Sequence, residues 1–167
     1  MKGYFGIDYG SRRIAVASLV DLPDGSLAHR IWVQRYGDDW DTYAVLADVY
    51  DLVATRQQAF APLVIAIESP IVGASKNAQT AVKMSMMAGS IAAAAGKGSS
   101  GIVLVPPSSW KASVVGRGNA GKHDVAAWLL DNHPHIYEEC IRERTGKVDQ
   151  DAVDASCLAL YARSALA

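Results

Sequence analysis

The chain has 167 residues, of which half are hydrophobic and a fifth are charged. This composition is typical of one soluble globular domain, which we expect to span residues 1–167, and it excludes a disordered chain. An acidic residue occurs within the first eight positions and no apolar stretch is long enough for a bilayer, so we expect a cytoplasmic protein without a membrane partner. Cys140 and Cys157 are too few for a disulfide framework and are predicted to be buried thiols.

The net charge of −1 conceals a strong segregation of charge along the chain. Residues 69–123 contain no Asp or Glu, yet they hold six of the 16 Lys and Arg residues. These six are Lys76, Lys83, Lys97, Lys111, Arg117 and Lys122. The rest of the chain therefore carries 10 basic and 17 acidic residues. Because surfaces normally mix both signs, the acid-free segment indicates an anionic partner, and phosphate groups fit such a segment.

The first part of the chain predicts three short strands, over residues 3–8, 13–20 and 27–35. Turn residues separate them closely, which favours an antiparallel meander. From residue 39 to about 60, apolar side chains recur at helical spacing. The continuous apolar run at 63–67 then predicts a central strand that is buried on both faces and ends at a glutamate.

The second part of the chain predicts a long helix over residues 76–95 and a fifth strand over 102–105. A proline pair ends this strand, and a glycine-rich loop leads into a helix over 122–132. The last helix is expected over about 149–165. The fold class is therefore α/β, with one five-stranded mixed sheet flanked by helices, and functional residues are expected where its strands end.

Four carboxylates occupy positions from which they could meet at one point. Asp8 ends the first strand and Glu68 the fourth, while Asp151 and Asp154 lie three residues apart on one face of the last helix. Carboxylate oxygens suit Mg²⁺ and Mn²⁺, and a pair of such ions ~4 Å apart is a known device for phosphodiester hydrolysis. Asp149 fits the N-cap of the last helix, and its role stays open.

Six segments, in this order, resemble those of RuvC-type Holliday-junction resolvases. They are GIDYGS (6–11), LVIAIE (63–68), KNA (76–78), PSSWK (107–111), GRGNAGK (116–122) and DAVDA (151–155). The resemblance covers nearly the whole chain. It implies a ribonuclease-H-like fold and a homodimer that cuts two strands of a four-way DNA junction symmetrically, with Mg²⁺ or Mn²⁺ as cofactor.

The resemblance also assigns roles to particular residues. It implies that the four carboxylates hold the metals, two ions per site, and that Lys111 and Lys122 contact DNA near the cut and support catalysis. The expected DNA-contacting residues are Lys76, Asn77, Lys83, Lys111, Arg117 and Lys122. The helix after Lys76, rich in Met and small residues, would form the dimer interface, although an ordinary core helix has the same composition.

One stretch departs from the family pattern, and other functions remain as alternatives. Residues 69–75 are longer than in bacterial resolvases and lack an aromatic residue for stacking on a base, so Ile71 or Val72 could act as a wedge instead. Strict preference for four-way junctions therefore stays open, as does a helicase partner. The opening segment also resembles YqgF-type ribosomal-RNA precursor nucleases, and a non-catalytic junction-binding module is the third possibility. His123 replaces the hydroxyl residue of a nucleotide-binding loop, which argues against ATP binding.

Overall fold

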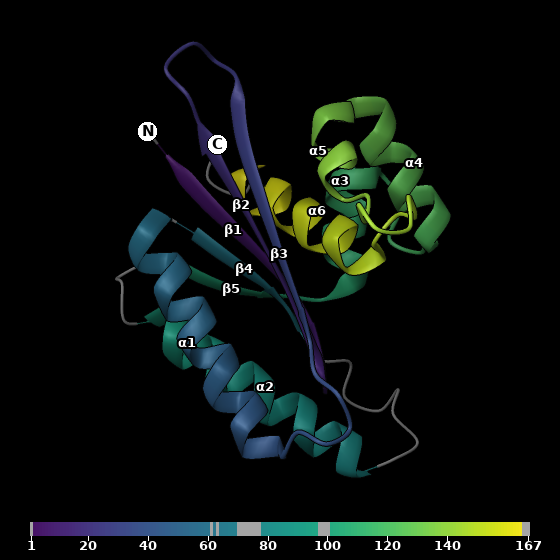
Figure 1. Cartoon of the computed structure of the whole chain (residues 1–167). Coiled ribbons are helices and arrows are strands. Elements are labelled where there is room, and N and C mark those ends of the chain that lie inside the picture. Colours follow the sequence, from purple (N-terminus) through teal and green to yellow (C-terminus); the bar gives the residue numbers. More distant parts are fainter. Residues whose placement is uncertain (1, 61, 63, 70–77, 97–100, 165–167) are drawn as a thin grey trace.

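The computed structural model describes residues 2–60, 62, 64–69, 78–96 and 101–164, which form five strands and six helices (Figure 1). The strands are β1 (Gly3–Gly10), β2 (Arg13–Asp21), β3 (Leu27–Arg35), β4 (Val64–Glu68) and β5 (Gly101–Val105). The helices are α1 (Thr42–Phe60), α2 (Ala78–Gly96), α3 (Pro107–Val115), α4 (Lys122–Asn132), α5 (Pro134–Glu139) and α6 (Gln150–Ser164). Within the described ranges, no helix has the length and apolar character needed to cross a membrane.

The strands form one mixed sheet in the order β3-β2-β1-β4-β5. The meander β1-β2-β3 is antiparallel, whereas β4 runs parallel to β1 and β5 runs parallel to β4. Parallel neighbours need a crossover, and α1 and α2 supply the helices that precede β4 and β5. The predicted five-stranded mixed sheet is confirmed, with β4 in its interior. The apolar run of β4 is buried on both faces as predicted, because Val64 and Ala66 pack in the core on the α6 side and Ile65 and Ile67 pack in the core on the α1 and α2 side.

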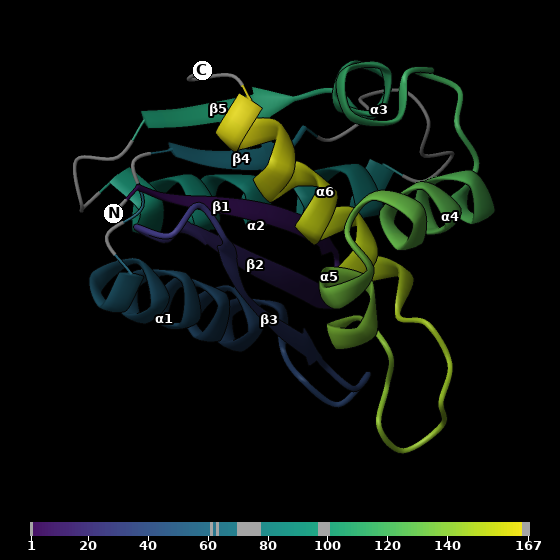
Figure 2. The ribbon, with the colours of Figure 1, turned by 90° about the horizontal axis from the view of Figure 1, so that it is seen from above.

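Helices cover both faces of the sheet. In Figure 1, α1 and α2 lie together on one side of the strands, and α3 to α6 lie on the other. Side chains alternate along β1, so Phe5, Ile7 and Tyr9 pack in the core beneath α1 and α2, and Tyr4 packs in the core beneath α6. Seen from above, α6 runs across the strands (Figure 2). By the same alternation, Asp8 belongs to the face that α6 covers.

Two helices were not predicted. The proline pair ends β5 at Val105 as predicted, but Pro107 also opens α3, and Pro134 opens α5 in the same way. Proline fits the first turn of a helix because its missing N–H has no intrahelical partner there. Gly116 then ends α3 with a φ of 91°, a conformation that glycine adopts without strain. The other elements agree with prediction to within a few residues, and both cysteines are buried free thiols as expected.

Candidate active site

Helix α6 lies against β1 in close backbone contact at Gly6. Any side chain at this position would overlap backbone atoms of Ala155 and Ala159, so only glycine permits the approach. Asp8 follows Gly6 by two positions and faces the same side of the sheet. The close contact therefore brings the first turns of α6, with their two aspartates, over the end of β1.

Three carboxylates gather where β1 and β4 meet α6. Ile7 and Ile67 are register partners in the parallel pair β1-β4, so Asp8 and Glu68 follow at adjacent strand ends. Asp154 reaches the same place from α6, and it interacts electrostatically with both of the other carboxylates. Asp8 is only 4% exposed, and the other two are half-buried. The structure thus places three of the four predicted acidic residues around the adjacent ends of β1 and β4.

The carboxylates of this cluster disfavour one another's negative charge. Burial raises the pKa of Asp8 to about 7, and the charge of Glu68 adds to this increase. Arg13 opposes the increase, while Asp154 contributes to it. Burial also raises the pKa values of Glu68 and Asp154 above their usual range. A bound cation would remove this repulsion, because it favours the ionised form of every carboxylate near it.

The fourth acidic residue, Asp151, is bound by two arginines. It is 8% exposed and lies in the first turn of α6, where Arg13 contacts one of its oxygens. Arg35 donates to its other oxygen at 2.8 Å. Arg13 also lies 3.9 Å from the Asp8 carboxylate, so it links Asp151 to the cluster. Sequence reasoning missed both arginines, because their place on the same face as Asp8 follows from the pairing register of β1, β2 and β3 together with strand alternation.

Asp149 caps the last helix, as its position suggested. Its carboxylate accepts the backbone N–H of Asp151 at 3.2 Å. Arg35 donates to both of its oxygens at 2.8 Å, and Arg142 donates at 2.9 Å. Although burial acts in the opposite direction, the hydrogen bonds from Arg142 and Arg35 hold the pKa of Asp149 below its usual value. Asp149 therefore acts as a fixed anion that anchors the start of α6.

Helix α3 holds Glu68 and a lysine in place through a buried tryptophan. The indole N–H of Trp110 donates to the Glu68 carboxylate at 2.9 Å, and this bond opposes the rise in the Glu68 pKa. Lys111 lies over the Trp110 ring, 5.5 Å from its centroid, and its ammonium donates to the Ala120 carbonyl at 3.1 Å. Because Trp110 is fully buried, its ring fixes the position of both charged neighbours.

The remaining predicted DNA contacts lie at different places. The charges of Lys111 and Lys122 both act on Asp154, so both lysines border the carboxylate cluster. Arg117 forms an ion pair with Asp124 at 2.7 Å, which satisfies part of its charge. Lys83 lies on α2, in the helical layer on the opposite face of the sheet. Four further expected residues lie outside the described ranges: Ile71, Val72, Lys76 and Asn77.

The donors of the cluster fit a hard divalent cation. All of them are carboxylate oxygens, the ligands that Mg²⁺ and Mn²⁺ prefer. In the described part of the chain, no three His, Cys, Asp or Glu side chains stand close enough together to hold an ion as they are. Asp151, for example, faces its two arginines. Ion binding therefore requires the acidic side chains to turn toward one another.

Comparison with known proteins relates the chain to junction-cutting nucleases. The family model described as "Crossover junction endodeoxyribonuclease RuvC" matches residues 4–138. This range includes Asp8, Glu68 and both lysines, and it ends before the two aspartates of α6. None of the curated proteins compared matches the sequence significantly.

Solved structures share the fold over most of the chain. Thermus thermophilus RuvC in complex with a Holliday junction substrate has a TM-score of 0.79 at 18% identity, covering 99% of this chain and 97% of that one. A second structure of Thermus thermophilus RuvC has a TM-score of 0.72 at 18% identity, with coverages of 95% and 90%. The yeast mitochondrial Holliday junction resolvase Ydc2 has a TM-score of 0.64 at 15% identity, with coverages of 93% and 75%.

The pKa of Asp8 predicts how metal-free stability depends on pH. The folded state holds its proton up to about pH 7, whereas the unfolded chain releases it near 3.8. Stability should therefore fall as the pH rises from about 4 to 7. In EDTA at pH 8, the free energy of unfolding of Asp8→Asn should be about 1–4 kcal/mol larger than that of the wild type, because the variant has no carboxylate to ionise at this position. At pH 4 the two should be nearly equal.

Denaturant unfolding at both pH values, with exposed Asp131→Asn as the control, measures this difference. An Asp8→Asn variant that is less stable than the wild type at pH 8 would contradict the electrostatic account of the cluster.

Proposed function

The chain belongs to the RuvC family of crossover junction endodeoxyribonucleases, and from this membership we propose that Asp8, Glu68, Asp151 and Asp154 form its catalytic centre. The observation that carries the proposal is the position of two buried and two half-buried carboxylates at the ends of β1 and β4 and the start of α6. Two lysines border this cluster. An anionic cluster beside cationic side chains is suited to binding a divalent cation together with a phosphodiester.

RuvC nucleases depend on divalent metals, and for this chain we propose Mg²⁺ or Mn²⁺, with two ions in each site. The donor chemistry of the cluster supports these ions. Such ions, when bound, make water nucleophilic and stabilise the leaving oxygen of the phosphodiester. The backbones of Asp8 and Glu68 are fixed by their strands, while Trp110 holds the Glu68 carboxylate through its indole N–H. A site built on strands and a helix keeps its ligands more precisely than a loop would.

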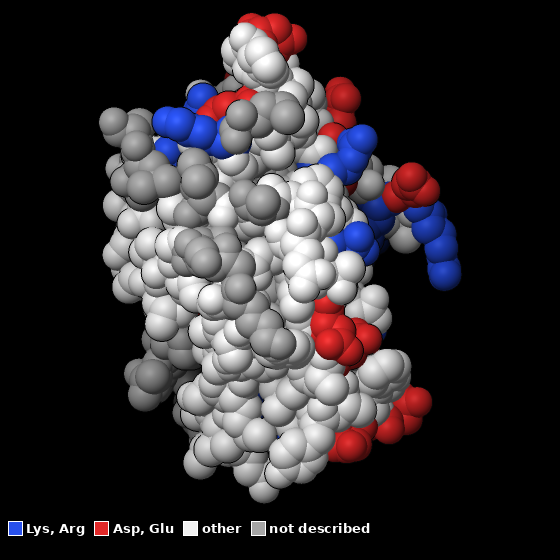
Figure 3. Space-filling view, turned by 90° about the vertical axis from the view of Figure 1, so that its left-hand side faces the viewer, with Lys and Arg blue, Asp and Glu red and all other residues white. Residues whose placement is uncertain are grey.

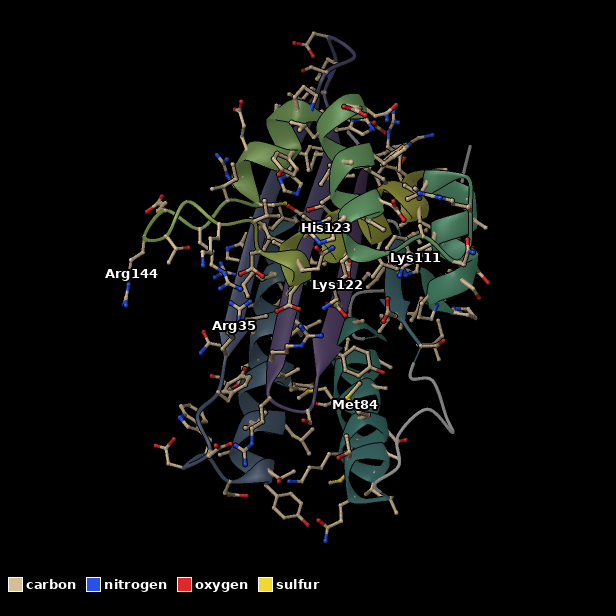
Figure 4. The ribbon with its side chains drawn as sticks, turned by 90° about the vertical axis from the view of Figure 1, so that its right-hand side faces the viewer. Arg35, Met84, Lys111, Lys122, His123 and Arg144 are labelled. Carbon is tan, nitrogen blue, oxygen red and sulfur yellow. The ribbon has the colours of Figure 1, made fainter. Side chains whose placement is uncertain are left out.

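Lys111 and Lys122 are proposed to bind the phosphate next to the scissile bond. Lys111 is held by the Ala120 carbonyl and by the Trp110 ring, so its charge has a defined position. Lys122 begins α4 and is exposed. In Figure 4 both labelled lysines lie on one face of the molecule. A compact ammonium placed there would stabilise negative charge that develops on the phosphate oxygens.

The substrate proposed for this site is branched DNA, and four-way junctions in particular. Family membership supports it, as does the shared fold with a RuvC bound to a Holliday junction substrate. On the side of the molecule opposite to the lysines, Figure 3 shows a broad area in which the described side chains are uncharged. This asymmetry supports DNA binding on the face of Lys111 and Lys122, because phosphate contacts supply most of the affinity for nucleic acid.

Two matched cuts need two sites, and we propose a homodimer formed through α2. Met87 and Ile91 are buried in the core of the protomer, so this side of α2 is not available for a dimer interface. The outward side of α2 carries Val82, which is 58% exposed, and the small exposed residues Gly89 and Ala93. Small side chains on a helix surface allow a second helix to approach closely, which supports an interface there.

Cleavage of a synthetic four-way junction tests the proposed activity. With Mg²⁺ or Mn²⁺, the wild type should cut the junction in two opposing strands and leave linear duplex and structured RNA intact. Asp8→Asn should still bind the junction but cut it at least ~100-fold more slowly, since an amide is a poorer ligand for a hard cation. Gel analysis of end-labelled strands gives both results. Cleavage of RNA with an intact junction would instead favour a YqgF-like ribosomal-RNA nuclease.

A substitution at Gly89 tests the dimer separately from the fold. A side chain added at Gly89 meets open space in the protomer. Gly89→Arg should therefore leave the thermal melting temperature of the protomer unchanged or raised, because glycine is a poor helix former. It should convert the dimer seen by light scattering into a monomer, whereas Gly89→Ala should remain dimeric. A wild type that is monomeric at micromolar concentration, or a dimeric Gly89→Arg, would contradict an interface through α2.

A further inference from the structure

Two arginines stand directly opposite each other on the face of the sheet that carries the carboxylates. Arg13 on β2 and Arg35 on β3 are register partners. Strand alternation places both on the α6 side, together with Asp8. Like charges at directly opposed positions of neighbouring strands are destabilising. The pair is therefore tolerated only because anions lie against it.

The anions that neutralise the pair belong to the start of α6. Arg13 contacts Asp151 and lies near Asp8, while Arg35 binds Asp151 and Asp149. Asp151 is thus shared by both guanidinium groups. It is also one of the proposed metal ligands, so the arginines occupy a carboxylate that a metal ion would need. A divalent cation and two guanidinium groups repel each other at such short range, and their binding to Asp151 is therefore competitive.

The arginines can leave Asp151 without removing every cationic partner from the neighbouring buried carboxylate, Asp149. Asp149 keeps its hydrogen bond from Arg142 when Arg35 moves away. The side chains of Arg13 and Arg35 are 42% and 44% exposed, so both can reach a molecule on the surface. In Figure 4, Arg35 lies on the same face as Lys122 and Lys111. A guanidinium group released there is well placed to bind a phosphate with two parallel hydrogen bonds.

We propose that Arg13 and Arg35 are exchangeable counter-ions of the catalytic centre. In the metal-free protein they neutralise Asp151. When a divalent cation takes the carboxylates, the two guanidinium groups turn to phosphates of the DNA and extend the basic face from the lysines toward β2 and β3. Metal binding thereby prepares the site for DNA, and DNA phosphates favour metal binding by withdrawing the competing cations. This inference rests on the proposed function, because it assumes that Asp151 is a metal ligand.

The proposal predicts opposite effects of one substitution on two ligands. Arg13→Gln and Arg35→Gln should each bind Mn²⁺ about threefold to tenfold more tightly than the wild type in the absence of DNA, because a competing cation is gone. Each should also bind a four-way junction more weakly in Ca²⁺, with the slope of log affinity against log salt reduced by about one. Isothermal titration calorimetry gives the metal affinity, and fluorescence anisotropy gives the junction affinity.

Two further variants separate this exchange from a structural role. Arg13→Lys keeps the charge and should bind Mn²⁺ as the wild type does. Arg30→Gln removes an exposed charge from the same strand as Arg35, five positions away, where it pairs with Glu139 of α5 and not with the carboxylates of the site, and should leave the Mn²⁺ affinity unchanged. Weaker or unchanged Mn²⁺ binding by both Gln variants would overturn the proposal. A wild type that binds Mn²⁺ but neither binds nor cuts junctions would instead refute the proposed function, and the Mn²⁺ comparison would still decide the competition.

Discussion

The contact between α6 and β1 at Gly6 is the constraint on which the site depends. A helix that covers a sheet is normally separated from it by the side chains of both layers. Here the absence of a side chain at Gly6, and alanines on α6, let the two backbones meet. The first turns of α6 then lie over the end of β1, where Asp8 stands. Without this approach, the carboxylates of the helix and the strands would belong to separate surfaces.

The same contact places several carboxylates close together, and cationic side chains surround them. Burial raises the pKa values of Asp8, Glu68 and Asp154. The charges of Glu68 and Asp154 raise the pKa of Asp8 further, and the charge of Asp154 also raises the pKa of Glu68. Lysines border the cluster on the α3 and α4 side, and arginines border it on the β2 and β3 side. The near-neutral total charge of the chain is thus the sum of an acidic centre and the cations around it. In the proposed function, metal ions would contact the acidic centre and the phosphodiester would contact the cations.

Much of the fold could be predicted from the sequence because its signals are local. Period-two alternation and the apolar run of β4 define strands, and the order of strand-end acids indicates the site. Helices α3 and α5 could not be predicted in this way, since a proline is compatible with the end of one element and with the first turn of a helix. In α3, the burial of Trp110 in the core favours the helix, and this packing is not a local signal. The roles of Arg13 and Arg35 depend on the pairing register of two strands with each other and on where α6 lies. Such information exists only in the folded chain.

A crystal structure with Mn²⁺, located by its anomalous scattering, tests the central claim most directly. We expect anomalous density bounded by the carboxylates of Asp8, Glu68 and Asp154, with Asp151 turned toward the ion and no longer within hydrogen-bonding distance of Arg13 and Arg35. Mn²⁺ bound elsewhere, or the same cluster left empty at saturating Mn²⁺ with both arginines still on Asp151, would contradict the account.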